Sequence, residues 1–337
     1  MLKLELKPYR LKLRHRFRIS RDAYDYQDSL IISLSSRGHV GYGETTANPY
    51  YGMELGDMME NIKAIRSDIE AYDFKEPESF HEFLSELTPH PFILCALDLA
   101  AWDLYGKKIA KPLYKIWNTS IAQYPVSNYT IGLDTVDNMI AKMEEQPWPI
   151  YKIKLGTDHD IEIVRELRQH SNAIFRIDAN CAWTARQTIN YAPVLKELGV
   201  EFIEQPLDAG DWQGMEQVQH HSVLPIIADE SCRTEEDVDQ CALHFNGINI
   251  KLTKCGGLTP ALRMIKRARE LGIKVMVGCM TESTVGISAI AQLLPQLDYV
   301  DMDGALLLKE DIATGVELLD GGIVKFPEMG GSGIQLL

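Results

Sequence analysis

The chain shows two kinds of hydrophobic pattern, and the change between them falls near residue 123. Apolar and polar residues alternate over 2–13 and 28–45, which predicts strands, and Arg37-Gly38 within the second run favours a hairpin turn. Three further segments carry apolar residues at helical spacing, 55–72, 77–87 and 93–109. These elements predict a small α+β domain over residues 1–122.

From residue 123 onward, short β-rich runs alternate with helical segments. The runs are 124–132, 150–156, 174–180, 200–206, 225–231, 247–252, 274–280 and 299–304. Eight strands joined by helical crossovers predict a parallel sheet that closes into a barrel. The remainder, about 311–337, is too short and too rich in glycine for a full eighth helix. We therefore expect an α/β fold, a modified TIM barrel of the (β/α)7β type over 123–310, with an N-terminal α+β capping domain that 311–337 completes.

Charged residues stand at the ends of most of these runs: Lys154, Asp178, Glu204, Asp229, Lys251, Asp301 and Asp303. Counted from Lys152, the successive steps to Asp178, Glu204, Asp229 and Lys251 are 26, 26, 25 and 22 residues. Each step spans one strand and one helix, so these side chains take equivalent places at the C-terminal mouth of the barrel, where catalytic groups lie. A single charged residue at a strand end is usually a solvated surface group. The regular spacing is what predicts a site.

Three of these residues predict a metal site. Asp178, Glu204 and Asp229 should converge from adjacent strands, and three converging carboxylates are unstable without a cation. All three ligands are hard oxygens, which favours Mg²⁺, with Mn²⁺ as a substitute, over Zn²⁺. Three protein ligands also leave positions on the metal open for oxygens of a substrate.

The lysines are expected to flank this metal. Lys152 and Lys154 lie two residues apart in one strand, so their side chains share a face, and burying two ammonium groups side by side is costly. A metal site on that face explains the pair, because neighbouring positive charge can lower the pKa of a lysine towards that of a useful base. Lys251 should stand on the opposite side of the ring.

At these residues the sequence resembles the enolase superfamily, in its muconate-lactonizing-enzyme subgroup. The resemblance covers nearly the whole chain and rests on five motifs: KIK at 152–154, DAN at 178–180, EQP at 204–206, ADES at 228–231 and IKLTKCGG at 250–257. It implies that Asp178, Glu204 and Asp229 bind Mg²⁺ and that Lys154 and Lys251 are the acid/base catalysts. It also implies that Lys152 tunes their pKa values and binds the substrate carboxylate.

The last motif holds a second lysine, Lys254, three residues after Lys251. The subgroup's catalytic lysine is the first of this pair, and the step to Lys251 fits the strand repeat. The shared chemistry of the family is removal of a proton α to a carboxylate, with Mg²⁺ stabilising the enediolate. Two lysines on opposite faces allow deprotonation on one side and reprotonation on the other, which suits an epimerase, an isomerase.

The eighth strand predicts the substrate. DMDG at 301–304 places Asp301 and Asp303 on one face, and it looks like the motif with which dipeptide epimerases of this subgroup hold the α-ammonium of a dipeptide. GCMTES at 278–283 and YTIG at 129–132 resemble the same branch, which adds Thr130, Cys279 and Met280 to the expected substrate contacts. The alternative is that the two aspartates only cap the barrel rim or pair with a lysine.

Loops of the capping domain, 15–28 and 46–54, are expected to cover the site as lids. L-Ala-D/L-Glu epimerases carry an arginine in the first loop for the glutamate carboxylate. Asp22 stands at that place here, with Arg21 adjacent. This favours an Ala-Xxx dipeptide whose second residue is uncharged, either small or hydrophobic.

Composition limits the partners. The 337 residues are 45% hydrophobic and carry a net charge of −14, which argues against nucleic acid or an anionic membrane as a partner. No apolar run is long enough to span a bilayer. The N-terminus reads as a strand rather than a signal peptide, and the six cysteines show no CxxC spacing, so we expect a cytoplasmic protein. The expected partners are a small dipeptide and further copies of the chain in a homo-oligomer.

Rival functions remain within the same subgroup: an o-succinylbenzoate synthase, an N-acylamino acid racemase, or a lactone-forming cycloisomerase. The substrates of the synthase and of the cycloisomerase have no ammonium group, so the pair Asp301 and Asp303 argues against both. A binding or scaffold protein that keeps only the fold is a further rival. The intact set of three acids and two bases argues against it.

Overall fold

The N-terminal part of the computed structural model, which describes residues 2–19 and 22–337, begins with an antiparallel sheet. Its strands are β1 (Lys3–Arg18), β2 (Ala23–Ser36) and β3 (His39–Thr46), in the order β1-β2-β3. Arg37 and Gly38 join the last two with φ values of 51° and 83°. Positive φ at both central residues is what a tight type I′ hairpin requires, so the predicted turn is confirmed.

Helices follow the sheet: η1 (Pro49–Tyr51), α1 (Leu55–Ala64), α2 (Arg66–Ala71), α3 (Pro77–Leu87), α4 (Pro91–Lys108) and α5 (Leu113–Ile116). α4 is apolar nearly all round and is buried against the sheet. A Cβ on Gly43 of β3 would lie 2.0 Å from the carbonyl oxygen of Ala96. Glycine at this position therefore lets α4 pack directly on the backbone of the sheet.

Eight parallel strands form the barrel: β4 (Tyr129–Ile131), β5 (Ile150–Lys154), β6 (Ile174–Asp178), β7 (Val200–Glu204), β8 (Ile226–Ala228), β9 (Gly247–Lys251), β10 (Lys274–Gly278) and β11 (Tyr299–Asp301). They pair in sequence order from β4 to β11. A parallel bridge between Ser127, just before β4, and Val300 of β11 closes the ring. Each predicted run therefore contains one barrel strand.

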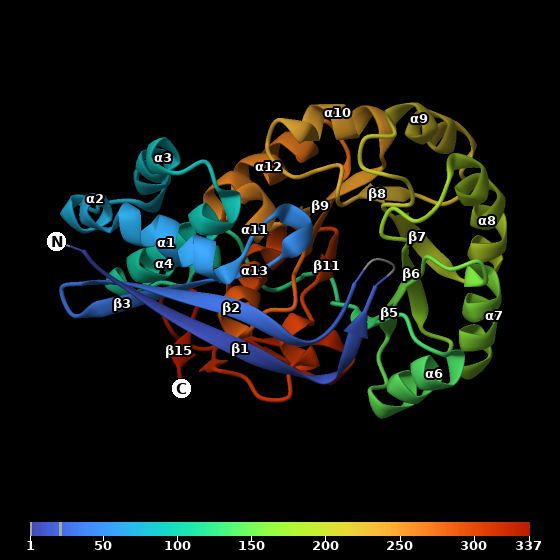
Figure 1. The fold of residues 1–337 in the computed structure, drawn as a ribbon, viewed down its shortest axis with the longest axis horizontal. Coiled ribbons are helices and arrows are strands. Elements are labelled where there is room, and N and C mark those ends of the chain that lie inside the picture. Colours follow the sequence, from blue (N-terminus) through green and yellow to red (C-terminus); the bar gives the residue numbers. More distant parts are fainter. Residues whose placement is uncertain (1, 20–21) are drawn as a thin grey trace.

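The helices around the barrel are α6 (Val136–Glu145), α7 (Asp160–His170), α8 (Ala185–Glu197), α9 (Trp212–His221), α10 (Asp237–His244), α11 (Leu252–Cys255), α12 (Leu258–Glu270) and α13 (Thr284–Leu293). In Figure 1, α6 to α10 form an outer layer around the strands. Among the residues described after β11 there is no α-helix; η3 (Gly304–Leu307) takes that place. The predicted (β/α)7β architecture is confirmed.

The C-terminal residues return to the N-terminal part of the molecule. They include the short strands β12 (Ala313–Thr314), β13 (Glu317–Leu318), β14 (Val324–Lys325) and β15 (Gln335–Leu336), and Figure 1 shows β15 beside the N-terminal sheet. Asp103 of α4 accepts a hydrogen bond from the Ser332 backbone at 2.8 Å, and Lys107 donates one to the Ile334 carbonyl at 2.9 Å. The division into 1–122 with 311–337 and 123–310 stays a prediction, which these contacts support.

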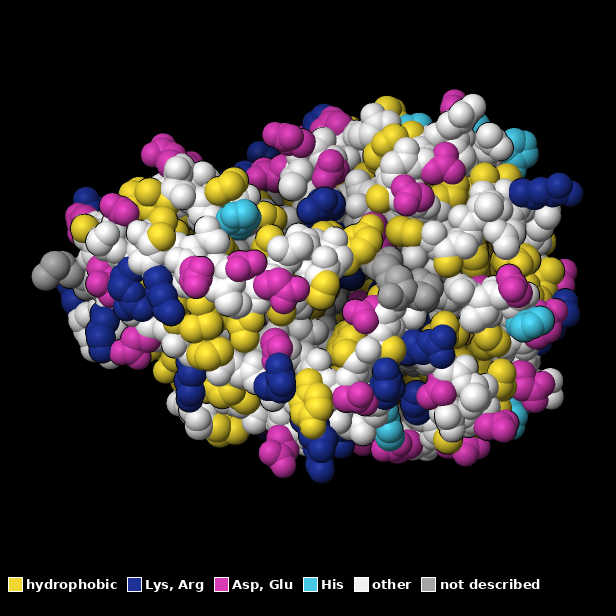
Figure 2. Space-filling model, in the orientation of Figure 1, with side chains coloured by type: hydrophobic (Ala, Val, Ile, Leu, Met, Phe, Trp, Pro, Cys, Tyr) yellow, Lys and Arg dark blue, Asp and Glu magenta, His cyan; other side chains and the backbone are white. Residues whose placement is uncertain are grey.

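The surface and the helices bear on possible partners. Figure 2 shows acidic and basic side chains mixed over most of the face in view, without one continuous basic surface. None of the helices in the described part of the chain has the length and the apolar character needed to cross a bilayer.

Candidate active site

Three neighbouring barrel strands bring three carboxylates together. Asp178 and Glu204 are the last residues of β6 and β7 and are paired in register, and Asp229 follows β8 directly. One oxygen of each lies within 4.8 Å of the others, and all three side chains are buried. The structure thus brings together the three residues that the sequence predicted as metal ligands.

Gln205 holds the loops behind these carboxylates. Its backbone has φ 34°, a left-handed conformation that is unfavourable for a residue other than glycine. Its side-chain oxygen accepts hydrogen bonds from the backbone N–H groups of Asp229, at 2.9 Å, and Ser231, at 3.1 Å. The residue after Glu204 therefore fixes the backbone from which Asp229 projects.

The carboxylates differ in their electrostatic surroundings. Burial raises the pKa of Glu204 to about 7, although Lys152 opposes this. Burial acts in the same direction on Asp178, but the nearby ammonium groups of Lys154 and Lys152 outweigh it and lower the pKa. The raised pKa of Glu204 reflects the cost of burying its negative charge, a cost that a bound cation would offset. Oxygen ligands and deep burial fit Mg²⁺.

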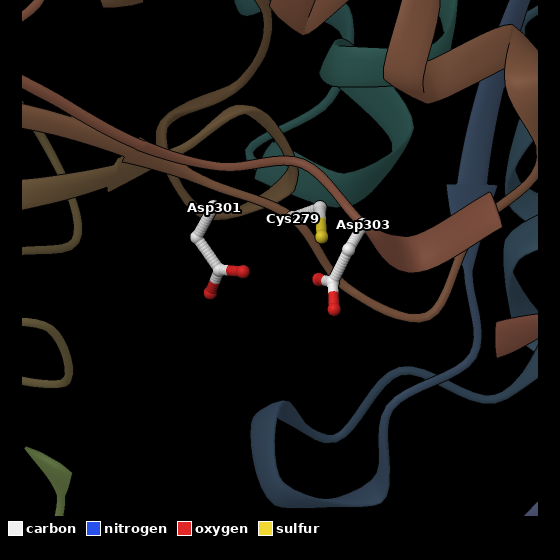
Figure 3. Close-up of side chains that lie close together, drawn as sticks. All are labelled: Cys279, Asp301 and Asp303. Atoms are coloured by element: carbon white, nitrogen blue, oxygen red, sulfur yellow. The ribbon is translucent and has the colours of Figure 1, made fainter. Parts of the chain in front are cut away.

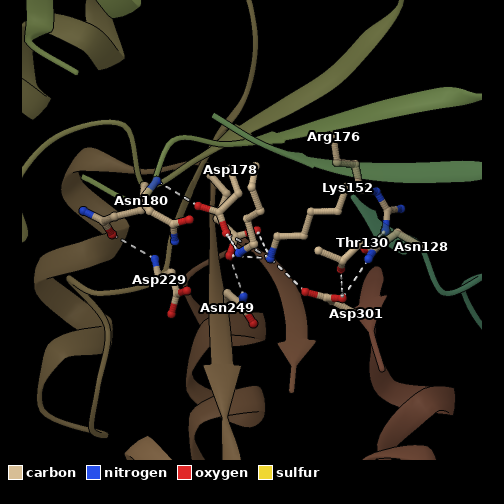
Figure 4. A network of polar contacts seen from close by, with 12 residues as sticks. Asn128, Thr130, Lys152, Arg176, Asp178, Asn180, Asp229, Asn249 and Asp301 are labelled. Carbon is tan, nitrogen blue, oxygen red and sulfur yellow. Dashed lines mark hydrogen bonds and ion pairs between the residues drawn. The ribbon is translucent and has the colours of Figure 1, made fainter. Parts of the chain in front are cut away.

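Lys152 lies in the barrel interior between two groups of carboxylates (Figure 4). Its Nζ is 2.8 Å from Glu204 Oε2, 3.2 Å from Asp178 Oδ2 and 2.8 Å from Asp301 Oδ2. The residue is 1% exposed, and it is not among the described residues that line the site's cavity of about 700 Å³. Burial disfavours the charged form, but the three carboxylates outweigh burial and raise the pKa. The sequence predicted a lowered lysine pKa at this site. With the charges of the protein alone, the pKa of Lys152 is instead raised.

Lys154 and Lys251 stand on opposite sides of the ring, because β5 and β9 are four positions apart in the order of eight strands. Lys154 Nζ is 2.6 Å from Asp178 Oδ2, and Lys251 Nζ is 2.8 Å from Asp229 Oδ2. Both lysines line the cavity. Two ammonium groups thus face one space from opposite strands, and each is paired with one of the buried carboxylates.

The cavity has a volume of about 700 Å³ and is built from both parts of the chain. Seven of the residues predicted from the sequence line it: Thr130, Lys154, Lys251, Cys279, Met280, Asp301 and Asp303. The two predicted lid segments contribute as well, among others through Phe17, Asp22 and Tyr24 of the first and Tyr50 and Tyr51 of the second. The prediction of a loop over 15–28 was wrong for most of its length, because β1 runs to Arg18 and β2 begins at Ala23. Arg21 lies outside the described residues.

Asp301 and Asp303 meet at the end of β11, with Cys279 beside them (Figure 3). Asp301 accepts a hydrogen bond from Asn128 at 2.7 Å, and Asp303 accepts one from the Thr130 backbone at 2.5 Å. Burial and the neighbouring Asp301 raise the pKa of Asp303, whereas Lys152 lowers that of Asp301 against the effect of burial. Asp301 therefore does pair with a lysine, and both carboxylates also line the cavity.

Sequence reasoning gave no role to two side chains at the site. Asn249 of β9 donates a hydrogen bond to Glu204 Oε1 at 2.8 Å. The sequence could have indicated that Asn249 lies at the site, because residues 249 and 251 share a face of their strand. A Cβ on Gly278 would lie 2.6 Å from Asn249 Oδ1, so the glycine makes room for this side chain. Lys254 is the other, and it contacts Asp229 instead of the cavity.

Comparisons with known proteins agree with this geometry. A family model described as enolase C-terminal domain-like matches residues 134–337. An L-Ala-D/L-amino acid epimerase from Maribacter sp. is 64% identical over 335 residues, which are 99% of each chain. A dipeptide epimerase from Cytophaga hutchinsonii, solved with Mg and D-Ala-L-Val, superimposes with a TM-score of 0.94 at 25% identity over 99% of this chain and 95% of the other.

A second solved relative is the dipeptide epimerase from Enterococcus faecalis V583, complexed with Mg and L-Leu-L-Tyr. It has a TM-score of 0.92 and 30% identity, and 98% of each chain is covered. The family model spans more than half of the present chain, and the Maribacter relative matches almost all of it. The chain therefore belongs to the enolase superfamily, in the branch that contains the dipeptide epimerases.

Proposed function

We propose that this protein is a Mg²⁺-dependent dipeptide epimerase that inverts the α-carbon of the C-terminal residue. The observation that carries the proposal is the pair of lysines, Lys154 and Lys251, which face one cavity from opposite strands beside three buried carboxylates. An enzyme that inverts a carbon centre needs a base on one face and an acid on the other. The Maribacter epimerase, at 64% identity, supports the same activity.

In this proposal the acidic residues and the lysines have different tasks. Asp178, Glu204 and Asp229 hold Mg²⁺, which when bound supplies positive charge to the substrate carboxylate and to the enediolate derived from it. One lysine, as a neutral amine, takes the α-proton, and the other, as an ammonium, gives a proton to the opposite face. Lys154 and Lys251 exchange these roles when the other epimer reacts. Lys152 is the predicted neighbour that tunes this charge balance, whereas its predicted contact with the substrate carboxylate gains no support from the cavity, whose described lining does not include it.

The dipeptide's α-ammonium is assigned to Asp301 and Asp303. Both carboxylates line the cavity, Asp301 as the last residue of β11 and Asp303 two residues beyond it, and β11 is across the ring from β7 and its Glu204. A dipeptide whose carboxylate lies near the metal site can then reach them with its other end. Thr130, Cys279 and Met280 line the cavity as well and are the remaining proposed substrate contacts.

The side chain of the second residue is proposed to be uncharged, as in an Ala-Xxx dipeptide. Apart from Lys154 and Lys251, the described residues that line the cavity include no lysine or arginine to receive a side-chain carboxylate. Phe17, Ile19 and Leu307 give the lid side of the cavity an apolar contribution. A small or hydrophobic side chain fits this lining, because burying an unpaired carboxylate is costly.

A dipeptide library in D₂O tests the proposal. Each dipeptide is incubated with the enzyme and Mg²⁺, and mass spectrometry detects deuterium at the α-carbon of the second residue. Free Ala-Xxx dipeptides with uncharged Xxx should gain one deuterium, and their N-acetylated counterparts should react much more slowly. Equal reaction of both sets would refute the ammonium assignment and favour an N-acylamino acid racemase. Absence of exchange in every dipeptide would refute the epimerase itself.

Assembly and compartment belong to the proposal only as expectations. The chain is proposed to act as a homo-oligomer in the cytoplasm, on a small dipeptide and not on nucleic acid or a membrane. The net charge of −14 supports the last point. Sedimentation velocity measures the assembly directly, and a single species of monomer mass would refute the homo-oligomer.

A further inference from the structure

Lys254 carries a buried ammonium group that the proposed reaction does not use. It lies on α11, the single helical turn that follows β9, three residues after Lys251. Its side chain is 0% exposed, and it is not among the described residues that line the cavity. A lysine closed off from the substrate cannot exchange a proton with it, so any effect on the reaction must pass through other groups of the protein.

The contacts of Lys254 all lie close to Asp229. Its Nζ donates hydrogen bonds to Asp229 Oδ1 at 2.6 Å, to the Asp229 carbonyl at 2.5 Å and to the Cys232 carbonyl at 2.9 Å. Three near acceptors match the three hydrogens of an ammonium group. A fourth, the Asn249 carbonyl, is at 3.3 Å. Lys254 thus binds both the side chain and the main chain of Asp229, together with the turn that follows.

As a result, the two carboxylate oxygens of Asp229 have different partners. Oδ1 accepts from Lys254, on the side closed to the cavity, whereas Oδ2 is 2.8 Å from Nζ of the cavity-lining Lys251. The backbone N–H of Asp229 is also held, by the side chain of Gln205. The carboxylate therefore has one orientation, in which Oδ2 is the oxygen presented to the site.

We propose that Lys254 is a positioning residue that keeps Oδ1 of Asp229 away from the metal and limits how strongly the site binds its cation. The inference rests on the proposed role of Asp229 as a metal ligand. Lys254 acts in two ways: it occupies one carboxylate oxygen of Asp229, and its positive charge repels the metal ion bound nearby. Both effects weaken the binding of the metal by the protein. A metal that the protein binds less strongly attracts the oxygens of the substrate carboxylate more strongly.

Lys254→Met tests this, because methionine is of similar length but has neither charge nor donor. With the charge removed and Oδ1 released, Mn²⁺ should bind about tenfold more tightly, as measured by the electron paramagnetic resonance signal of free Mn²⁺. The kcat/KM for the dipeptide should nevertheless fall at least about tenfold, and equally for both epimers. Tighter metal binding together with lower activity is a signature that simple structural damage does not produce, because damage weakens both.

Lys254→Gln serves as the second variant, since methionine removes the donor to Asp229 Oδ1 and to the Cys232 carbonyl, both buried, and so endangers folding. Glutamine keeps an N–H donor for Asp229 but lacks the charge. It should bind Mn²⁺ more tightly than the wild type while losing less activity than the methionine variant. Lys266→Met, which removes an exposed lysine of α12, is the matched control for the loss of one charge and should change neither quantity.

The outcomes separate this inference from the proposed function. Mn²⁺ affinity that is unchanged or weaker in the folded glutamine variant would overturn the positioning role. Loss of exchange from only one epimer would overturn it as well, because Lys254 would then be one of the two bases. A wild-type protein that binds no Mn²⁺, or binds it as well after Asp229→Asn, would instead refute the metal site and with it this inference.

Discussion

Nζ of Lys152 lies 2.8 Å from Oδ2 of Asp301 and 2.8 Å from Oε2 of Glu204, although β11 and β7 are on opposite sides of the barrel. One ammonium group thus links the proposed metal site to the proposed ammonium site through the barrel interior. The side chain is 1% exposed, so water contributes little to its solvation. The two proposed halves of the substrate site are therefore joined by a single buried charge.

Removing that charge should destabilise the fold. Lys152→Met leaves several buried carboxylates without their common partner, and breaking a buried ion pair in this way costs about 3–5 kcal/mol. Urea unfolding in the presence of EDTA measures the loss. Lys325→Met is the matched control, since its pair with Glu317 is more than half exposed and should contribute below about 1 kcal/mol. Equal losses in the two variants would contradict the central position of Lys152.

The two lysines on opposite strands should each serve one epimer. If Lys154 is the base for one face, Lys154→Ala should abolish α-proton exchange from one epimer of the dipeptide and spare the other. Lys251→Ala should show the converse. The measurement is deuterium incorporation in D₂O from each pure epimer, followed by mass spectrometry at early times. Equal residual exchange from both epimers in both variants would exclude a two-base reaction.

Asp303 gives a cleaner test of ammonium recognition than Asp301, because Asp301 is also the partner of Lys152. Asp303→Asn keeps an oxygen that can accept the Thr130 N–H but removes the charge. The kcat/KM for a free dipeptide should fall about ten- to a hundredfold, as expected for a lost charge-assisted hydrogen bond of roughly 1.5–3 kcal/mol. The same variant should leave the low rate with an N-acetylated dipeptide unchanged; a proportional fall there would assign Asp303 another role.

Metal removal should abolish turnover without unfolding the chain. The Asp178, Glu204 and Asp229 carboxylates hold the proposed cation, while Lys152, Lys154 and Lys251 offset their charge within the protein. Dialysis against EDTA should therefore eliminate activity but leave the circular dichroism spectrum intact, and Mg²⁺ or Mn²⁺ should restore the rate. Full activity in protein shown by elemental analysis to lack metal would refute the assignment.

Asp98, which does not belong to the site, should make the free energy of unfolding depend on pH. It is fully buried in α4 and caps α12 by accepting from the Thr259 N–H at 2.9 Å, and burial raises its pKa to about 7. Between about pH 4 and pH 7 the native carboxyl keeps a proton that the unfolded chain has lost. Raising the pH through this window therefore favours unfolding, by at most about 1.4 kcal/mol per pH unit.

Comparison with Asp98→Asn isolates this effect, because asparagine does not titrate. Urea unfolding at roughly pH 5 and pH 8 should show the wild type losing stability relative to the variant as the pH rises. If the free energy of unfolding changes equally with pH in the two proteins, or rises with pH in the wild type relative to the variant, Asp98 is ionised in the native state over the whole range.

The spacing of strands and charged residues along the sequence predicts much of the fold and of the site, because a barrel repeats one structural unit. Each strand, loop and helix occupies a similar number of residues, so strand-end residues such as Asp178 and Glu204 can be aligned by counting along the chain. Their positions agree with the structure, where both end their strands. The absence of an α-helix among the residues described after β11 followed in the same way from the length and glycine content of the last segment.

Contacts across the barrel could not be predicted in this way. Lys152 and Asp301 are 149 positions apart in the sequence, and periodicity along one strand does not tell which groups touch from opposite sides. The direction of the lysine pKa values could not be predicted for the same reason: it depends on the number of carboxylates within reach of each ammonium. The role of Lys254 could not be predicted either, because its contact with Asp229 and its absence from the described lining of the cavity do not follow from sequence spacing.

The cavity wall is shared between two stretches of the chain that fold on different cores. Described residues of 15–28 and 46–54, among them Phe17, Asp22 and Tyr51, contribute side chains to the lining, while Lys154, Lys251 and Asp301 come from the barrel. Substitutions at Phe17 or Asp22 can therefore alter which dipeptide is preferred while the reacting groups keep their places. Substrate preference can therefore change gradually during evolution. Each substitution in these two segments starts from an active enzyme, and the reacting groups of the barrel stay the same.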